Sequence, residues 1–458
     1  MDRKEIDGLR ANFRGELIAP GDAGYDAARK VYNGMIDKRP ALIAKCVDVA
    51  DVITGVNLAR EKKLLLAVRG GGHNGPGLGI CDGGLVIDLS RMKSVRVDQK
   101  AQTVRVEGGC VWGDVDHATS PFGVVVPSGF ISTTGVGGLT LGGGIGYLSR
   151  TYGLTIDSLI GVDMVLADGR VVTASADENA DLFWAVRGGG GNFGVVTSFL
   201  FRANKLNPTV YGGPIMWPME KSGEVLRWWR DFIQKAPENI NGWFAFAMVP
   251  PVPMFPAEHH GKKVAMICWC YTGDPAKADE VFKPIRKFSP PLMDFAGPIP
   301  FTVLQSLFDA LYPPGLQWYW KADFFAELTD KAIDLHVKYG DRLPSGHSTM
   351  HIYPINGAAH RAKKGDTAFN FRDASFAEVI VGVDPDPKNN PRLIEWAKDY
   401  WLAMHPHSLG GGYINMMMDE GEDNVKNSYR DNYARLAKVK KTYDPGNLFR
   451  VNQNIKPG

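Results

Sequence analysis

The chain has 458 residues, 44% of them hydrophobic and 22% charged, and its 52 basic and 50 acidic residues almost cancel. This length predicts two domains, or one domain with a large insertion. The balanced charge argues against nucleic acid as a partner, and the lack of any run of about 18 apolar residues argues against a membrane span.

The N-terminal segment and the cysteines indicate the compartment. The first residues, MDRKEIDGLRANFRGEL, are charged and lack the apolar core of a secretory signal. The five cysteines are an odd, sparse set, typical of a reducing compartment rather than of a disulfide framework. Cys268 and Cys270 share one face of a predicted strand, but no second pair of ligands lies nearby, so we predict no metal site. We expect a cytoplasmic protein.

The first 208 residues alternate strand and helix signals. Residues 41–68 predict a strand, an amphipathic helix and a buried strand, because apolar residues recur at helical spacing in the middle of this segment. The elements expected next are strands near 85–89, 94–98 and 103–109, a helix over 111–123, a strand, turn and strand over 159–173, and a helix over 176–187. Three glycine-rich tracts interrupt these elements, at 69–79, 127–146 and 188–194.

After Pro208 the sequence changes in character, with fewer glycine clusters, more aromatic residues and alternating runs such as GWFAFAMV and HSTMHIYPI. This pattern predicts an antiparallel sheet covered on one side by helices. The expected helices lie at 223–234, 275–287, 329–339 and 391–403, and a further charged helix lies around 429–441. The resulting α+β fold has residues 1–208 and 413–458 in one domain and residues 209–412 in a second, inserted domain.

The glycine tracts carry the first functional signal. Two spans match G-x-G-x-x-G: Gly70, Gly72 and Gly75 in the first tract, and Gly189, Gly191 and Gly194 in the third. A nicotinamide site needs a strand, then the glycines, then a helix, and neither span has that order. Glycine-rich backbone can still approach a ligand closely and hold a diphosphate through its N–H groups. The alternative, tight turns and bulges only, stays open on the residues alone.

Four motifs in a fixed order then point to a family. They are RGGGHNGPGLGICDGGLVIDLSRM, STTGVGGLTLGGGIGYLSRTYGL, ADENADLFWAVRGGGGNFGVVTSF and YDPGNLFRVNQNI. Together they resemble the vanillyl-alcohol oxidase and p-cresol methylhydroxylase superfamily, and more narrowly its berberine-bridge-enzyme-like branch. The resemblance is dense over residues 40–200 and 413–456 and looser between 210 and 345.

The resemblance implies an FAD-binding domain of the p-cresol methylhydroxylase type, built from two α/β pieces, with an inserted substrate domain. It also implies that His73 bonds covalently to the 8α-methyl group of the flavin. Neutral imidazole is a competent nucleophile for such a bond; the alternative is a histidine that only makes hydrogen bonds in a loop. Many relatives add a second link through a cysteine, but Ile131 stands at that place and Cys110 lies too far upstream. We therefore expect FAD attached through His73 only.

The same resemblance assigns the other residues of the cofactor site. The expected FAD-binding residues are Arg69, Gly70, Gly71, Gly72, His73, Asn74, Gly135, Gly138, Gly142, Gly143, Val196, Asn452 and Asn454. For the two C-terminal asparagines the alternative is capping of a strand end.

The implied reaction moves a hydride from a carbon bearing oxygen or nitrogen to flavin N5, while a base accepts a proton. The candidate catalytic residues are Tyr413 and Asn415, expected on one face at period two, His351 and Tyr353 on one strand face, and Tyr319 in a third wall with Trp320 and Lys321. Relatives carry a second tyrosine, linked to proton abstraction, where this chain has Met416. Core packing is the alternative for each.

The sequence thus predicts an FAD-dependent oxidase that acts on an alcohol, hemiacetal or amine carbon of a small molecule, with O2 as electron acceptor. Three alternatives remain: a dehydrogenase that passes electrons to a quinone or a protein, a flavin-binding protein with little turnover, and a reductase whose flavin is reduced directly by NADPH. The sequence names neither the substrate nor the oligomeric state.

Overall fold

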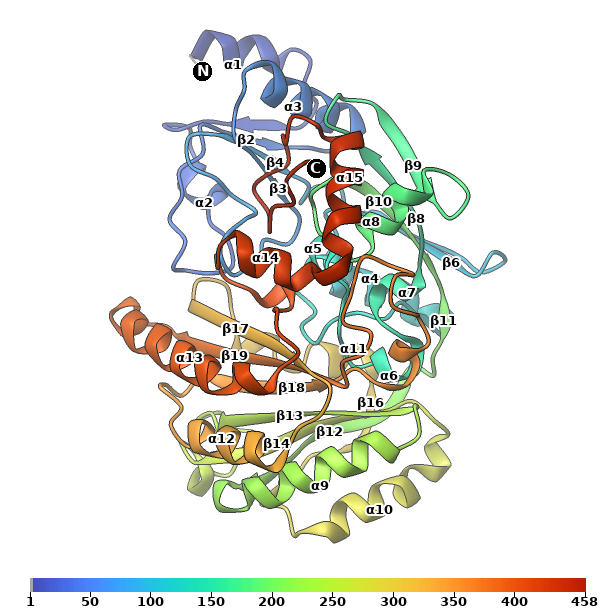
Figure 1. Ribbon diagram of the computed structural model, residues 1–458, viewed down its shortest axis with the longest axis vertical. Coiled ribbons are helices and arrows are strands. Elements are labelled where there is room, and N and C mark those ends of the chain that lie inside the picture. The colour runs from blue at the N-terminus through green and yellow to red at the C-terminus, as the bar shows by residue number, and fades with distance from the viewer. Residues whose placement is uncertain (1–2) are drawn as a thin grey trace.

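The structure is a computed structural model that describes residues 3–458. Segments from the two ends of the chain share one half of the elongated molecule, and the middle of the chain fills the other half (Figure 1). No helix in the described part of the chain has the length and apolar character needed to cross a membrane.

A small N-terminal sheet positions the first glycine tract. Its strands follow the order β1-β2-β4-β3, with bounds Glu16–Ile18, Leu42–Lys45, Leu85–Asp88 and Leu66–Arg69. β2, β4 and β3 run parallel, and α3 (Val49–Glu61) makes the crossover. α3 begins where the Asp48 side chain accepts a hydrogen bond from Asp51 N, which satisfies a free N–H of the first turn. Because β3 ends at Arg69, the glycine tract starts directly at a strand end.

A second, antiparallel sheet lies beside it and carries the other two tracts. Its order is β5-β6-β10-β8-β9, with bounds Val95–Asp98, Thr103–Glu107, Val195–Arg202, Leu159–Val165 and Val171–Ser175. The associated helices are α4 (Trp112–Thr119), α5 (Val136–Leu141), α6 (Ser149–Tyr152), α7 (Thr155–Ser158) and α8 (Ala180–Val186). The short strands β7 (Val124–Val125) and β11 (Asn204–Lys205) pair with each other.

The middle of the chain forms a large antiparallel sheet with the order β15-β12-β14-β13-β18-β19-β17, and β16 also pairs with β12. The bounds, in chain order from β12 to β19, are Thr209–Pro218, Ile240–Met248, Lys263–Tyr271, Met293–Asp294, Gly297–Pro300, Gln317–Phe325, Thr349–Pro354 and Phe376–Asp384. Its helices are α9 (Ser222–Lys235), α10 (Ala278–Phe288), α11 (Phe301–Gln305), α12 (Asp330–Gly340) and α13 (Asn390–Met404).

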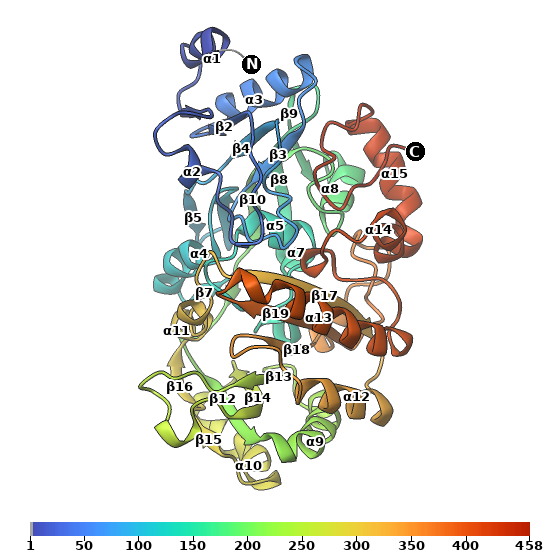
Figure 2. The same ribbon diagram turned by 90° about the vertical axis from the view of Figure 1, so that its left-hand side faces the viewer.

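The alternation of each strand gives this sheet two buried faces. One face packs on helices α9, α10, α12 and α13 through residues such as Trp229 and Phe244. The opposite face packs on the segment from Ile145 to Ile156 through residues such as Trp243 and Tyr353. Figure 2 shows the large sheet between these helices and the first two sheets. The face that meets the glycine-rich half is therefore the one that can form a site.

The C-terminal segment returns to the first half of the molecule. α14 (Glu422–Tyr429) is followed by α15 (Tyr433–Tyr443), and α15 packs against α8. The remaining elements are the short helices α1 (Arg3–Arg10) and α2 (Tyr25–Ala28) and the 3-10 turns Ser120–Phe122, Met219–Lys221, Ala257–His259, Pro275–Lys277, Asp309–Leu311, Gly357–His360, Pro387–Asn389, His405–His407, Ile414–Met416 and Arg430–Asn432.

The α+β class predicted from the sequence is confirmed, and the four helices expected over the large sheet are present as α9, α10, α12 and α13. The second glycine tract contains the short helix α5. One expectation was wrong. The segment after Tyr413 is a 3-10 turn, not an extended strand, because Met416 N donates to Tyr413 O at 2.7 Å and closes the chain locally.

Candidate active site

A cavity lies where the glycine tracts meet the large sheet. Its lining from the tracts and their neighbours includes Arg69 to Asn74, Phe130, Ile131, Gly135, Gly137, Gly138, Leu139, Gly190, Gly191, Asn192 and Val196. Its lining from the large sheet and the C-terminal segment includes Trp320, Tyr353, Tyr413, Ile414, Asn415, Met416, Tyr429, Asn452 and Gln453. One end of the wall is thus glycine-rich backbone, and another part is aromatic.

The glycines here allow backbone to meet backbone. A Cβ atom on Gly71 would lie 2.5 Å from Gly135 N, and one on Gly135 would lie 2.4 Å from Gly71 N, so the first two tracts touch with no room for a side chain. Gly72 has a φ of 71°, which favours glycine. Arg69 is held by Asp88 at 2.7 Å. The backbone of the first two tracts thus forms a cradle along the cavity that holds no free cation, which fits a diphosphate-bearing cofactor bound by backbone N–H groups.

His73 stands in this wall as a neutral imidazole. Its Nε2 lies 3.1 Å from Thr133 Oγ1, and its ring stacks on Tyr32 with centroids 3.9 Å apart. Tyr32 is itself fixed, because its hydroxyl donates to Tyr312 O at 2.7 Å. Burial lowers the pKa of His73 to about 4, so the ring keeps a free lone pair at neutral pH. Such a ring is suited to nucleophilic attack on a bound cofactor.

Tyr413 and Asn415 lie together, although the turn between them is not a strand. The Tyr413 hydroxyl accepts hydrogen bonds from Gly144 N at 3.0 Å and from Asn415 Nδ2 at 2.9 Å. Asn415 Nδ2 also donates to Leu139 O at 3.0 Å, which ties this turn to α5. Burial raises the pKa of Tyr413, while the two donors oppose that effect. The phenol is therefore neutral and rigidly placed.

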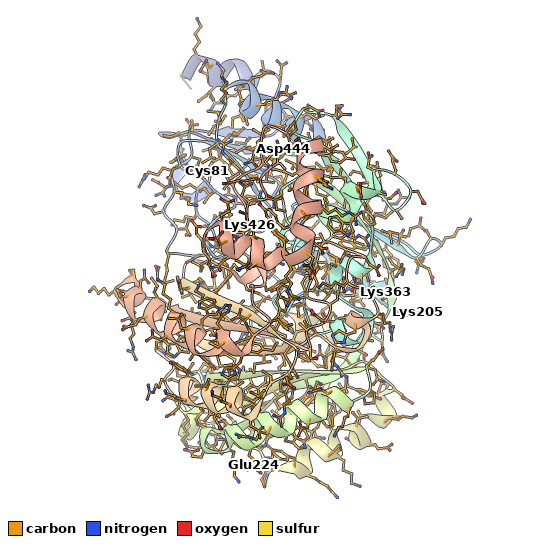
Figure 3. All side chains as sticks on the ribbon, viewed as in Figure 1. Cys81, Lys205, Glu224, Lys363, Lys426 and Asp444 are labelled. Carbon is orange, nitrogen blue, oxygen red and sulfur yellow. The ribbon has the colours of Figure 1, made fainter. Side chains whose placement is uncertain are left out.

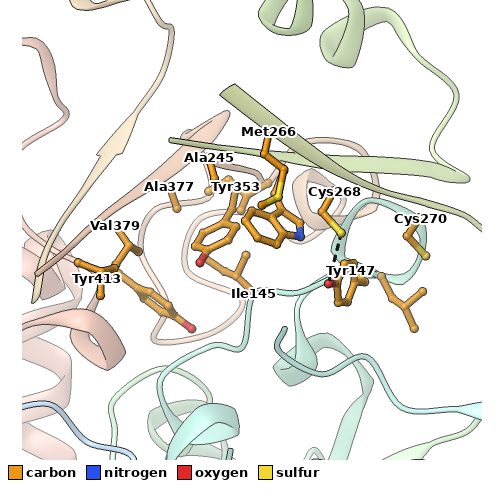
Figure 4. Packing of buried hydrophobic residues seen from close by; sticks show 14 of the residues in the cluster. Ile145, Tyr147, Ala245, Met266, Cys268, Cys270, Tyr353, Ala377, Val379 and Tyr413 are labelled. Atoms are coloured by element: carbon orange, nitrogen blue, oxygen red, sulfur yellow. Dashed lines mark hydrogen bonds between the residues drawn. The ribbon is translucent and has the colours of Figure 1, made fainter. Parts of the chain in front are cut away.

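His351 and Tyr353 share a face of β18, as predicted. His351 Nδ1 lies 2.6 Å from the Tyr353 hydroxyl, and the Tyr353 ring stacks on Phe130 with centroids 4.4 Å apart. Burial lowers the pKa of His351 to about 3 and raises the pKa of Tyr353. Both side chains are therefore uncharged at neutral pH. Figure 4 shows Tyr353 and Tyr413 in the buried cluster with Ile145.

Tyr319 was wrongly expected in the cavity wall. Strand alternation sends Trp320 to the cavity and turns Tyr319 to the other face of β17, where Lys398 lies 5.9 Å from its ring centroid. Lys321 also faces away and pairs with Glu420 at 3.0 Å. Trp320 is thus the one residue of the expected third wall that lines the cavity.

Several predicted cofactor residues do not line the cavity. Gly142 and Gly143 lie behind it, where a Cβ on Gly142 would come within 2.1 Å of Asn415 Oδ1. Gly142 thus makes room for Asn415. Asn454 is absent from the lining and its buried Oδ1 has no hydrogen-bond partner, whereas Asn452 lines the cavity and donates to Gly191 O at 2.9 Å.

Sequence reasoning missed part of the wall. Phe130, Asn192, Tyr429 and Gln453 line the cavity and were not singled out. Asn192 lies within the third glycine tract, and Gln453 lies between Asn452 and Asn454. Both could therefore have been predicted from the motifs that surround them. Phe130 and Tyr429 had none. The five cysteines are buried free thiols, and none belongs to the cavity lining.

A backbone cradle, a neutral histidine beside it and two tyrosines in one cavity define a cofactor-dependent enzyme. A family model described as an FAD binding domain matches residues 40–175, and one described as berberine and berberine like matches residues 412–456. An FAD-linked oxidoreductase of Dictyostelium discoideum is 32% identical over 97% of this chain and 95% of its own length.

Solved structures agree with these matches. The crystal structure of 6-hydroxy-D-nicotine oxidase from Arthrobacter nicotinovorans superposes with a TM-score of 0.87 at 27% identity, covering 97% of this chain and 98% of that one. Glucooligosaccharide oxidase from Acremonium strictum, which carries 6-S-cysteinyl, 8α-N1-histidyl FAD, shares the fold with a TM-score of 0.86 at 23% identity, covering 99% of each chain. The chain belongs to the berberine-bridge-enzyme-like branch of the vanillyl-alcohol oxidase superfamily, and it is an FAD-linked oxidoreductase. The resemblance found in its sequence is confirmed.

Proposed function

We propose that this protein is an FAD-dependent oxidase that removes a hydride from an alcohol, hemiacetal or amine carbon of a small organic molecule and passes the electrons to O2. The observation that carries the proposal is the shared cavity: His73 stands in a glycine-lined wall, and Tyr353 and Tyr413 line the same space. When bound there, the flavin supplies the hydride acceptor. The chain supplies the cradle, the orientation and the proton-handling groups.

The cofactor is attached through His73 alone. Support comes from the neutral His73 ring, which Tyr32 and Thr133 hold in one orientation. Ile131 lines the cavity at the position where relatives place a cysteine, and no cysteine joins it in the lining. A second thioether link therefore has no sulfur to form it.

The residues that hold FAD are those of the cradle. We assign this role to Arg69 to Asn74, Gly135, Gly138, Val196 and Asn452, which line the cavity. Residues 1–208 and 413–458 form the FAD domain, and residues 209–412 form the substrate domain. The cavity lies between these two parts of the chain, which supports the division. Trp320 and Tyr353 line it from the large sheet, opposite the glycine tracts.

A visible spectrum followed by acid precipitation tests the cofactor assignment. Yellow colour that stays with the precipitated protein supports the His73 bond, and yellow colour in the supernatant contradicts it while leaving FAD binding intact. A colourless protein that also refuses added FAD contradicts the whole proposal. Oxygen consumption during turnover separates an oxidase from a dehydrogenase with another acceptor.

A further inference from the structure

We propose that Tyr353 and His351 together accept the proton of a substrate hydroxyl, while Tyr413 donates a hydrogen bond to the same oxygen. This assignment rests on the proposed function, and it gives the two tyrosines of the cavity opposite roles. It also assigns the substrate class: a neutral alcohol or hemiacetal.

Tyr413 is restricted to donating. A phenol oxygen offers one O–H and has room for about two hydrogen-bond donors. Gly144 N at 3.0 Å and Asn415 Nδ2 at 2.9 Å both donate to it. Its acceptor capacity is therefore used, and its own O–H is what remains for a ligand in the cavity. A donor held in this way orients a substrate oxygen but does not remove its proton.

Tyr353 has the opposite polarity. Its hydroxyl oxygen lies 2.6 Å from His351 Nδ1. We assign the phenol as the donor in this contact, because a neutral imidazole has one ring nitrogen that carries no proton and accepts. His351 is neutral and can accept, and its proton then resides on Nε2. Since the Tyr353 O–H is directed to His351, its oxygen can accept a substrate hydroxyl.

These polarities define one balanced step. When bound, FAD would accept the hydride that leaves as the carbon–hydrogen bond of the substrate breaks. The substrate hydroxyl proton passes to Tyr353, the Tyr353 proton passes to His351 Nδ1, and the substrate becomes a carbonyl compound. His351 thus receives the released proton only transiently, because burial lowers the pKa of its ring to about 3. Relatives carry a tyrosine linked to proton abstraction where this chain has Met416. With Tyr353 and His351 accepting the proton, that tyrosine is not needed here.

The lining also favours a neutral substrate. No aspartate or glutamate lines the cavity in the described part of the chain, and the one charged residue in the lining, Arg69, is paired with Asp88. A protonated amine would lose its hydration there without gaining a carboxylate, which is costly. The aromatic side chains of Phe130 and Trp320 instead offer apolar surface beside the two hydroxyls.

Nitrogen NMR of the isotope-labelled full-length protein tests the polarity without catalysis. The His351 signal, assigned by its loss in His351→Gln, is expected to show the neutral Nε2–H form and to remain neutral at pH 5. A ring protonated on Nδ1 at neutral pH, whether neutral or cationic, would overturn the proposal. Because this measurement needs no turnover, it stays informative even if the protein binds no FAD and the proposed function fails.

Anaerobic flavin reduction tests the roles. The probe is the compound that reduces the flavin fastest among benzyl alcohol, allyl alcohol and glucose. Tyr353→Phe is expected to slow reduction by about 10²–10⁴-fold with little change in the dissociation constant, and His351→Gln to slow it in the same direction. Tyr413→Phe is expected mainly to weaken binding. Tyr147→Phe is the control, because its hydroxyl faces Cys268 and does not line the cavity. A wild-type reduction rate in Tyr353→Phe would overturn the assignment.

Discussion

His405 Nδ1 lies 2.9 Å from a carboxylate oxygen of Asp323, whose side chain is buried on the helix-facing side of β17. Two residues earlier on the same face, Lys321 pairs with Glu420 at 3.0 Å. These two pairs fix both ends of the segment 405–420, which carries Tyr413 and Asn415. The opposite face of one strand therefore anchors the chain that supplies part of the active site.

The Asp323 and His405 pair predicts a dependence of stability on pH. Burial raises the pKa of Asp323 to about 6, and the hydrogen bond to Asp323 raises the pKa of His405. Both shifts make the folded state bind more protons than the unfolded state. Stability is therefore expected to fall as pH rises from about 4 past 7, first as Asp323 ionises and then as His405 loses its proton.

Melting temperatures between pH 4 and 8 test this expectation. Asp323→Asn removes both shifts, so its melting temperature should fall less steeply with pH than that of the wild type. Lys321, Glu420 and the buried Glu378 also influence Asp323 and stay in place in this variant. Asp163→Asn, which breaks an exposed pair with Arg105, serves as control. Equal slopes in wild type and Asp323→Asn would contradict the prediction.

A buried lysine ties the C-terminal helix to the third glycine tract. Lys440 Nζ donates to Asp444 Oδ2 at 2.7 Å, to Asn192 O at 2.6 Å and to Phe449 O at 3.0 Å. Lys440→Met leaves a buried carboxylate without its partner, so we expect a loss of about 3–5 kcal/mol in unfolding free energy. Denaturant unfolding of the purified protein measures it.

Lys426→Met is the matched control, because Lys426 forms an exposed pair with Glu422, and solvent screens such pairs so that they contribute little to stability. Figure 3 labels Lys426 on α14 and Asp444 directly after α15. A similar loss in both variants would mean that the burial of Lys440 does not matter.

The contact between the first two glycine tracts predicts a strong effect of a single methyl group. In Gly135→Ala the new Cβ would lie 2.4 Å from Gly71 N, so the tracts must separate. We expect a loss of about 1–3 kcal/mol in stability and weaker FAD retention. Gly297→Ala is the control, since a Cβ there meets nothing within 4 Å. If Gly135→Ala matches this control in flavin content and in unfolding free energy, the cofactor site tolerates separation of the first two tracts.

The sequence predicted this fold well where periodicity and residue chemistry agree. The first tract follows its strand directly, and His351 and Tyr353 share a strand face because alternation is local. Strand alternation could not place Tyr319. Both faces of β17 are buried and carry aromatic residues, so the sequence does not show which face meets the cavity. Gly142 does not line the cavity, and a Cβ there would meet Asn415, so this glycine makes space for a neighbouring side chain.

His73→Ala separates attachment of the flavin from binding. The variant keeps the backbone cradle, so we expect it to bind FAD reversibly and to lose all covalently bound flavin. Denaturation followed by filtration should release the flavin of the variant and retain that of the wild type with the protein. Equal release from both proteins would contradict the proposed bond.

Matched pairs of ligands test the neutral character of the cavity. Benzyl alcohol and benzylamine have the same skeleton, but the amine is protonated at neutral pH and must shed its hydration against a lining without carboxylates. We expect the alcohol to perturb the flavin spectrum at concentrations at least about tenfold lower than the amine, a difference of about 1.4 kcal/mol in binding free energy. Raising the pH toward the pKa of the amine should narrow this difference, because the neutral amine becomes available. Tighter binding of the amine at neutral pH would show that an anionic group reaches the cavity once FAD is bound.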